Sequence, residues 1–251
     1  MNDDDITEVV KRGPMLERLA DGPVGSGDLE RDLSASRSTI HRVLDRMGDL
    51  GVVSRCEQGY ELTQMGRLVA TRVASVRREL RAIGRAEPFF RDATLDGVDL
   101  PLDLLADATV VEPPAGRAHF TVKRVSDLMA DAESMRMFST VVSPLYVDLC
   151  VRHAKRGADI EAIFDRAVVD TLFSEYGSES REAAAEGGLC VRAHDCCPFE
   201  LFVFDRTVGM TAHDDAGVSH AFVELDGEAA VAWATDLFER YAADAEYVTL
   251  F

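Results

Sequence analysis

The stretch "SASRSTIHRVLDRMGDLGVVSR" (residues 34–55) decides the fold predicted for the N-terminal part of the chain. We predict a helix that begins after Ser36, whose hydroxyl suits a helix N-terminus, and ends at Gly51, a residue type that often closes helices. At about 100° per residue, the apolar side chains gather on one face and the polar side chains on the other. The apolar face comprises Ile40, Val43, Leu44 and Met47, and the polar face comprises Arg37, Ser38, His41, Arg42, Asp45 and Arg46.

Shorter helical patterns precede this stretch, and a hairpin pattern follows it. Residues 5–22 place apolar side chains at helical spacing on both sides of a Gly-Pro pair, and residues 26–35 indicate a short second helix. Residues 52–63 alternate apolar and polar side chains on either side of "EQG", as two antiparallel strands do. Three helices followed by a hairpin are the elements of a winged helix-turn-helix, whose third helix enters the major groove of DNA. We therefore predict such a domain over residues 1–63.

The third helix and the hairpin carry side chains that suit contact with double-stranded promoter DNA. Arginine can bind guanine through two hydrogen bonds, and serine or threonine can reach base edges or phosphates. The alternation of the hairpin also turns Tyr60 toward the core. The predicted DNA-binding residues are Arg37, Ser38, Thr39, His41, Arg42 and Arg46 on the helix and Arg55, Gln58 and Tyr60 on the hairpin.

The charge of the chain is unevenly distributed. The formal net charge of −18 opposes binding to a polyanion when it is taken as a whole. Residues 1–90 carry 14 basic and 15 acidic side chains, whereas residues 91–251 carry 13 basic and 30 acidic ones. Within residues 31–85, 11 arginines face six acidic residues, a local net charge of +5. The predicted recognition helix therefore lies where DNA is tolerated, and the asymmetry indicates two domains.

The acidic excess also indicates a habitat and a compartment. Acidic residues are spread along the chain, and only three of its 27 basic residues are lysine, a composition typical of the salt-filled cytosol of halophilic archaea. At molar salt the Debye length is about 3 Å, so self-repulsion is screened. The start "MNDDDITEVV" lacks the basic residues of a signal peptide, and no apolar run approaches the roughly 18 residues of a membrane span. We expect a cytoplasmic protein with no membrane segment.

The segment "SRSTIHRVLDRMGDLGVVSRCEQGYELTQMGRLVA" (residues 36–70) resembles the archaeal winged helix-turn-helix regulators. Their usual phrase contains "LxxLGxV", a wing and then "YxLTxxGR". The resemblance covers about residues 6–70 and implies a DNA-binding transcriptional regulator. The alternative is a winged helix that docks on proteins and never touches DNA. The residues that match the phrase are Met47, Leu50, Gly51, Val53, Tyr60, Leu62, Thr63, Gly66 and Arg67.

A long connecting helix is predicted over residues 64–90, capped by Thr63 and stopped before Pro88. Its apolar residues step by four and three, the spacing of a coiled-coil seam. We expect this helix to pair two chains as a homodimer, as these regulators usually do. The alternative is a linker helix packed on the chain's own C-terminal domain. The predicted dimerisation residues are Val69, Val73, Val76, Leu80 and Ile83.

Residues 100–251 alternate short strand-like runs with helical ones. Strand patterns occur at 108–113, at the end of the run 125–143, which begins as a helix, at 159–165 and in four further runs between residues 188 and 225, and helical patterns lie between them. The last helical pattern runs from residue 226 to residue 248. This alternation implies an α/β sheet covered by helices. The predicted fold class is thus an α+β winged helix-turn-helix followed by an α/β domain.

The second domain is similar to the sensor domain of Fil-type archaeal regulators, first named for methanogenesis control. The similarity is carried by "ATVVEP", "RGADIEAIFDRAVVDTL", "ELFVFDRTVGMTAHDD" and "AVAWATDLFERY". It implies a phospholipase-D-like architecture that lacks the catalytic motifs. The run "HAKRGAD" (residues 153–159) has three residues between Lys and Asp where the phosphodiesterase motif has four, and it occurs once, whereas that chemistry needs two such motifs. We therefore predict no enzyme activity and no cofactor.

A small-molecule effector would bind at the carboxyl ends of the strands, where open α/β sheets usually bind ligands. The predicted ligand-binding residues are Ser143, Asp165, His194, Asp205 and His213. The run "CVRAHDCCPFE" (residues 190–200) offers a weak metal or thiol-redox alternative through His194, Cys196 and Cys197, because adjacent cysteines chelate poorly. We expect no metal and reduced thiols at all five cysteines.

Overall fold

The computed structural model describes residues 1–114, 120–130, 132–141, 143–172, 174 and 188–248. The helix expected over residues 179–188 falls almost wholly outside these ranges. The chain divides into two compact units, Met1–Arg81 and Ala82–Phe251. Each unit has its own apolar core, so each is described by itself.

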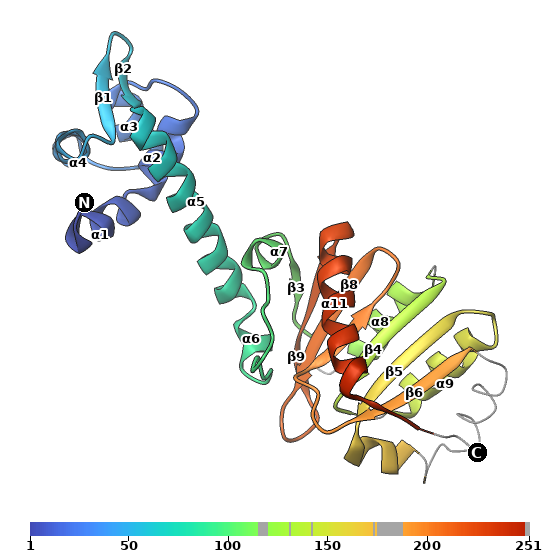
Figure 1. Ribbon diagram of the computed structural model, residues 1–251. Helices are drawn as coiled ribbons and strands as arrows, with labels where there is room; N and C mark the ends of the chain where they lie inside the picture. Colours follow the sequence, from blue (N-terminus) through green and yellow to red (C-terminus); the bar gives the residue numbers. More distant parts are fainter. Residues whose placement is uncertain (115–119, 131, 142, 173, 175–187, 249–251) are drawn as a thin grey trace. The chain divides into compact units, whose positions relative to one another are not determined.

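The N-terminal unit contains the helices and the hairpin that the sequence indicates, in the order expected for a winged helix-turn-helix (Figure 1). The first helical pattern forms two helices, because Pro14 in the first turn of the second cannot continue the first. A β-bridge between Val24 and Tyr60 adds a short third strand to the hairpin. The elements are α1 (Asp3–Lys11), α2 (Gly13–Ala20), α3 (Ser26–Asp32), α4 (Arg37–Asp49), β1 (Val53–Cys56), β2 (Gly59–Leu62) and α5 (Gln64–Arg85).

The core of this unit forms where the helices meet. All four residues of the apolar face predicted for the third helix are buried in α4, and none is more than 3% exposed. They pack with Leu16 and Leu19 of α2, Leu29 of α3 and Leu62 of β2. Burying a side chain of this size stabilises the fold by about 1.5–3 kcal/mol. The hydrophobic spacing of α4 therefore fixes which of its faces remains free.

The "YxLTxxGR" phrase closes the junction between the hairpin and α5. The Thr63 hydroxyl donates to the carbonyl of Gly51 (2.6 Å) and accepts from the backbone N–H of Gly66 (2.9 Å), so it caps α5 and ties it to the end of α4. A Cβ at Gly66 would lie 1.9 Å from the carbonyl oxygen of Val52. Glycine is therefore the residue that lets α5 start this close to the hairpin.

The connecting segment predicted over residues 64–90, with a stop before Pro88, forms two helices. The long helix α5 ends at Arg85, and a separate helix, α6, spans Glu87–Phe90. Pro88 lies in the first turn of α6, where its missing N–H costs nothing. Phe89 is buried in the C-terminal core, so the chain turns at Ala86 to bring the ring inside.

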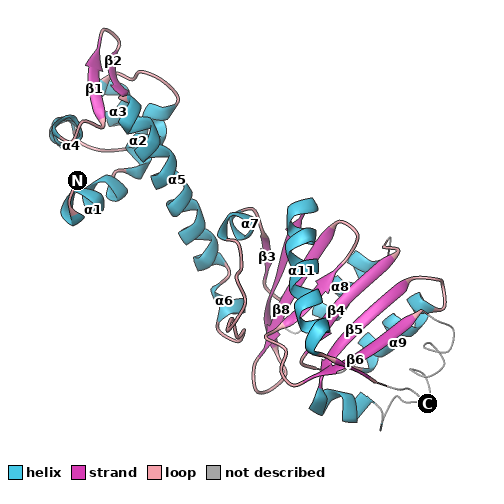
Figure 2. Ribbon diagram, in the orientation of Figure 1, coloured by secondary structure: helices cyan, strands magenta, loops and turns pink. Residues whose placement is uncertain are grey.

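The C-terminal unit is built on one eight-stranded mixed sheet with the strand order β10-β6-β5-β4-β7-β8-β9-β3 (Figure 2). The pairs β4–β5 and β5–β6 are parallel and the remaining pairs are antiparallel. The strands are β3 (Thr109–Val111), β4 (Ser134–Ser139), β5 (Asp159–Asp165), β6 (Leu189–His194), β7 (Glu200–Val203), β8 (Thr207–His213), β9 (Ser219–Asp226) and β10 (Glu246–Tyr247).

Helices cover both faces of this sheet, as the alternation predicts (Figure 1). One face packs against α11 (Glu228–Asp244), α6 and α7 (Leu102–Ala106), and the other packs against α8 (Phe120–Met129) and α9 (Pro144–Ala154). Residues 166–172 are helical and add Leu172 to the second face. The last helix is shorter than predicted, because Glu246 and Tyr247 leave it to pair with β6 as an edge strand.

Candidate nucleic-acid interface

The N-terminus of α4 is held by a group of hydroxyls. The Ser36 side chain accepts from the backbone N–H of Thr39 (3.3 Å), as the sequence indicates for a capping serine. The Ser36 hydroxyl also lies 3.1 Å from the hydroxyl of Ser38 and 2.9 Å from that of Thr39. Thr39 is half-buried and its hydroxyl is engaged, whereas Ser38 is exposed. The capping group therefore leaves Ser38 as the hydroxyl that can reach a ligand.

Arg37 and Arg42 are the free cations of α4. Both side chains are exposed, and neither forms an ion pair with an acidic residue anywhere in the part of the chain that the structure describes. His41, between them on the same face, is half-buried. A helix N-terminus with exposed guanidinium groups is suited to phosphate and to guanine edges.

The Arg46 side chain forms an ion pair within the N-terminal unit. Its guanidinium donates to the carboxylate of Asp5 on α1, and the Asp5 side chain is only 13% exposed. Asp5 also caps α1 by accepting from the backbone N–H of Asn2 (2.9 Å). Sequence spacing placed Arg46 on the polar face, but it could not show that α1 supplies a carboxylate beside it. This ion pair ties α4 to α1, but the Arg46 side chain remains 45% exposed, so its contact with DNA stays a prediction.

The hairpin presents Arg55 and Gln58, and both are exposed. Arg55 opposes Tyr60 across the two strands, and its guanidinium lies 5.8 Å from the centre of the Tyr60 ring. Tyr60 is half-buried, packs against the core and exchanges two backbone hydrogen bonds of 2.9 Å with Val24. Tyr60 thus supports Arg55 and anchors the hairpin, in agreement with the inward orientation that the alternation indicates.

Acidic residues occupy the second half of α4. Asp45 and Asp49 are exposed, one and two turns beyond His41. Their negative charge repels phosphates, so the basic surface of α4 is confined to its first two turns. Sequence reasoning noted Asp45 on the polar face but assigned it no role. An aspartate on this face can accept a hydrogen bond from the N4 amino group of cytosine.

The predicted dimerisation residues do not form one exposed seam. Val73 is buried, and Val69 packs beside it against the core of the N-terminal unit. Ile83 packs against the core of the C-terminal unit. Val76 and Leu80 are 44% and 59% exposed. The four-three spacing of α5 therefore serves internal packing as well as an outer surface.

In the C-terminal unit, the predicted ligand residues lie at both ends of the strands. Asp165 accepts from the backbone N–H of Cys197 (2.6 Å), His194 accepts from that of Cys196 (3.1 Å), and Ser143 caps α9. Asp205 accepts hydrogen bonds from the backbone N–H groups of Glu133 and Ser134 at the amino end of β4. This is the end of the strands opposite to the other predicted residues. The expectation that Asp205 shares an edge with the others is wrong, because β7 runs antiparallel to β4.

A buried acid that sequence reasoning missed lies at the carboxyl end of β4. Glu200, the first residue of β7, is fully buried, accepts from the Ser139 hydroxyl, and has its second oxygen 3.6 Å from Nδ1 of His213. Burial raises the pKa of Glu200 to about 8 and lowers the pKa of His213. At neutral pH both groups are therefore neutral. Only the mixed sheet reveals this cluster, since Glu200 and Ser139 are 61 residues apart.

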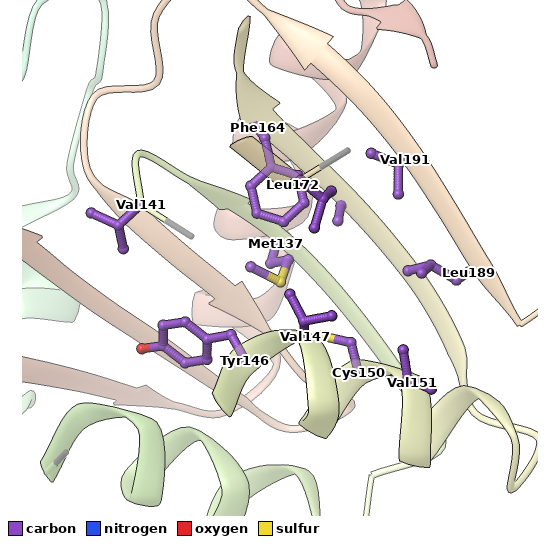
Figure 3. Close-up of a pocket in the computed structure, with 11 residues that line it drawn as sticks. Met137, Val141, Tyr146, Val147, Cys150, Val151, Phe164, Leu172, Leu189 and Val191 are labelled. Atoms are coloured by element: carbon purple, nitrogen blue, oxygen red, sulfur yellow. The ribbon is translucent and has the colours of Figure 1, made fainter. Parts of the chain in front are cut away.

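Beside this cluster, an apolar cavity of about 30 Å³ lies between α9 and the sheet. Met137, Phe164 and Val191 line it from the strands, and Cys150 lines it from α9 (Figure 3). The Tyr146 ring lies at one end of the cavity, and its hydroxyl points away from the side chains at the other end (Figure 3). This volume would accommodate one or two water molecules, but an apolar lining offers them few hydrogen-bond partners.

The cysteines do not form a metal site among the described residues, where no group of three metal-binding side chains occurs. All five are free thiols, and Cys196 is the exposed one. Burial and the Asp165 carboxylate raise the pKa of the Cys197 thiol, which makes it a poor nucleophile. In the same described ranges, no helix is both long and apolar enough to cross a membrane.

Two protein-family models match the chain, one in its N-terminal part and one in its C-terminal part. Residues 2–85 match the model of the HVO_A0261 N-terminal domain, and residues 118–244 match that of the methanogenesis regulatory protein FilR1, middle domain. No curated protein sequence matches the chain significantly. The two matched domains define the class, an archaeal regulator with an N-terminal helical domain and a C-terminal α/β domain. Within that class, the chain belongs to the family of the FilR1 middle domain.

Solved structures of similar fold share little sequence with the chain. TrmBL2, described as an archaeal chromatin protein with a novel mode of DNA binding, is 18% identical with a TM-score of 0.46, over 95% of this chain and 94% of that one. Nuc, a phospholipase D family member from Salmonella typhimurium, is 17% identical with a TM-score of 0.42, over 57% of this chain and 99% of that one.

Proposed function

We propose that the chain is a sequence-specific, DNA-binding transcriptional regulator that acts as a homodimer. The first two turns of α4 read the major groove, and the hairpin contacts the backbone as a wing. The observation that carries this proposal is the set of exposed arginines, Arg37, Arg42 and Arg55, without acidic partners in the described ranges. In a chain of net charge −18, guanidinium groups left unpaired are available for an external anion.

The proposal assigns Ser38, His41 and Gln58 to the same surface, with Thr39 and Tyr60 as supports. Family membership and the regulator after which the family is named agree with this role. The acidic, lysine-poor composition indicates that the protein binds DNA at high salt. Counterion release contributes little at molar salt, so affinity rests on direct contacts and on DNA shape.

The decisive experiment measures binding to duplex DNA from the region upstream of the protein's own gene, at high KCl, by fluorescence anisotropy. Arg37→Ala with Arg42→Ala should weaken binding by about 100-fold, because each base or phosphate contact contributes roughly 1–3 kcal/mol. The matched control is Arg156→Ala with Arg206→Ala, which removes two exposed arginines from the C-terminal unit. Equal losses in both variants would show that bulk charge governs binding. No loss in the first variant would contradict the assignment of α4.

The C-terminal unit is proposed as a phospholipase-D-like sensor domain without catalysis. Ser143, Asp165, His194 and His213 lie at the carboxyl edge of β4–β6 or beside it, and Glu200 joins them there. A ligand that favours one dimer geometry would change the spacing of the two recognition helices and so the affinity for DNA. His153, in the last turn of α9, is not proposed as a nucleophile, because its motif has three residues between Lys155 and Asp159 instead of four and occurs once in the sequence.

Two alternatives stay open to test. A winged helix that docks only on protein would show no DNA binding in the experiment above. A thiol-redox or metal-responsive regulator would use Cys196 and Cys197 with His194. The variant with both Cys196→Ser and Cys197→Ser distinguishes this alternative from the proposed function. Its DNA binding is assayed with and without oxidant. An oxidant response that persists without both sulfurs excludes these thiols.

A further inference from the structure

The exposed large apolar side chains of the N-terminal unit gather on its first and last helices. None of α2, α3, α4 or the hairpin, all within the described residues, exposes such a side chain. At about 100° per residue, the four from α5 fall within a 120° arc, so they form one stripe along the helix. The exposed side chains are Met1 and Ile6, at or near the start of α1, and Met65, Leu68, Val76 and Leu80 of α5.

Where α1 and α5 lie next to each other, the stripe borders an apolar groove. The groove has a volume of about 280 Å³ and is lined by Ile6 and Val10 of α1 and by Leu68 and Val69 of α5. Its polar lining residue is Arg72, which is exposed and has no acidic partner in the described part of the chain. Leu68 is 73% exposed at the rim of the groove. An exposed apolar groove with a charged side chain at its rim is the kind of surface at which proteins associate.

We propose that a second copy of this chain occupies the groove, with Leu68 of each subunit inserted between α1 and α5 of the other. The inference rests on the proposed function, in which the regulator binds DNA as a dimer. A two-fold interface must be self-complementary, since the same surface contributes both halves. This surface meets that requirement, because it carries a projecting apolar side chain next to an apolar groove that can receive it.

Charge on the two helices supports the same partner. The first turn of α1 is acidic, and Asp3 and Asp4 are exposed. Laying α1 of one subunit across α5 of the other brings this acidic turn toward the partner subunit's Arg72. A second copy thus supplies the carboxylate that Arg72 lacks within its own chain. Opposite charges at the rim of an apolar contact set its register.

This surface differs from a coiled coil formed by α5 alone. Val73 is buried within its own unit and Ile83 packs against the C-terminal core, so neither is available for a partner helix. The contact is instead a four-helix arrangement of two α1 and two α5 helices. Val76 and Leu80 extend it along α5.

The test is sedimentation equilibrium of the full chain in high KCl. The wild type should have the mass of two chains, and Leu68→Glu should raise the dissociation constant at least about 100-fold, since a charge replaces a buried leucine. Ile6→Glu should do the same. Val218→Glu, at a side chain 48% exposed in the C-terminal unit, is the matched control and should remain dimeric. Unchanged circular dichroism shows that each variant is folded.

A charge exchange gives a second measurement. Arg72→Asp should weaken the dimer about tenfold, and adding Asp3→Arg should restore it, which a merely structural role for either residue would not produce. A Leu68→Glu variant that stays dimeric, or a wild type that is monomeric throughout, would overturn the inference.

DNA binding separates this inference from the proposed function. Monomeric Leu68→Glu should bind a duplex with one half-site as well as the wild type does, and lose about 100-fold on an inverted repeat. A dimer that binds neither duplex would contradict DNA binding and leave the interface intact.

Discussion

Three arginines that lie on or against the C-terminal sheet and three arginines on α4 and the hairpin differ in whether a carboxylate pairs with them. In the C-terminal unit, Arg124 of α8 pairs with Glu224 of β9, and Arg136 of β4 and Arg192 of β6 both reach Glu161 of β5. On α4 and the hairpin of the N-terminal unit, Arg37, Arg42 and Arg55 remain exposed, without an ion-pair partner among the described residues. A paired arginine contributes to folding, whereas an unpaired one is free to contribute to binding. Net charge alone conceals this difference.

The largest effect is expected for Gly66→Ala, which should lower the stability of the N-terminal unit alone. Its Cβ would overlap the Val52 carbonyl at 1.9 Å, so α5 must move away from the hairpin. We expect a loss of about 3 kcal/mol, the upper end for overpacking. Differential scanning calorimetry should show the transition of this unit at a lower temperature and that of the other unit unchanged. A parallel shift of both would show that the two units unfold as one.

Arg124→Ala tests the paired class of arginines. Glu224, whose side chain is 6% exposed, would lose the guanidinium that neutralises it. The partial exposure of Arg124 moderates the cost, so we expect about 2 kcal/mol in urea unfolding, below the usual range for a fully buried pair. Affinity for DNA should not change. A weaker DNA complex with unaltered unfolding would reverse the distinction between paired and unpaired arginines.

The stability of the C-terminal unit should depend on pH through Glu200. Its pKa rises from 4.5 to about 8, so between these values the folded state holds a proton that the unfolded state has released, and stability falls as pH rises. His213, whose pKa is lowered from 6.5, acts in the opposite direction at lower pH. From pH 6.5 to pH 8 we expect the wild type to lose about 1.5 kcal/mol more than Glu200→Gln. Equal slopes in urea titrations would contradict this.

The smallest expected effect is that of Asp45→Asn. Removing a carboxylate from the exposed face of α4 should strengthen binding to unrelated duplex about threefold, because one phosphate repulsion disappears. Binding to the specific site should gain less, or weaken, if Asp45 reads a cytosine. Anisotropy on both duplexes gives the ratio. Asp21→Asn, an exposed acid at the end of α2, is the control.

Much of the N-terminal unit could be predicted because its determinants are local. The spacing of Ile40, Val43, Leu44 and Met47 decided which face of α4 is buried. The alternation around Gly59 decided the hairpin. Most strands of the C-terminal sheet were predicted for the same reason, but β10 was predicted as helix and the order of the strands was not predicted.

The site was predicted less completely than the fold. Periodicity separates exposed from buried positions, and it identified Arg37, Ser38 and Arg42 as exposed. It could not show that Arg46 meets Asp5, because that pair joins residues 41 apart. Nor could it show that α1 lies along α5 and forms a groove.

By itself, the sequence determined where most of the helices lie, which side of α4 is polar and where the acidic charge is concentrated, since these depend on neighbours within a few positions. Only the tertiary structure decided which of the arginines are free, that Glu200 is buried beside His213, and that Asp205 lies at the other edge of the sheet. Those facts depend on chain direction and on contacts between distant segments. The free energy of these contacts depends on burial, and a local pattern of residues predicts neither the contacts nor the burial.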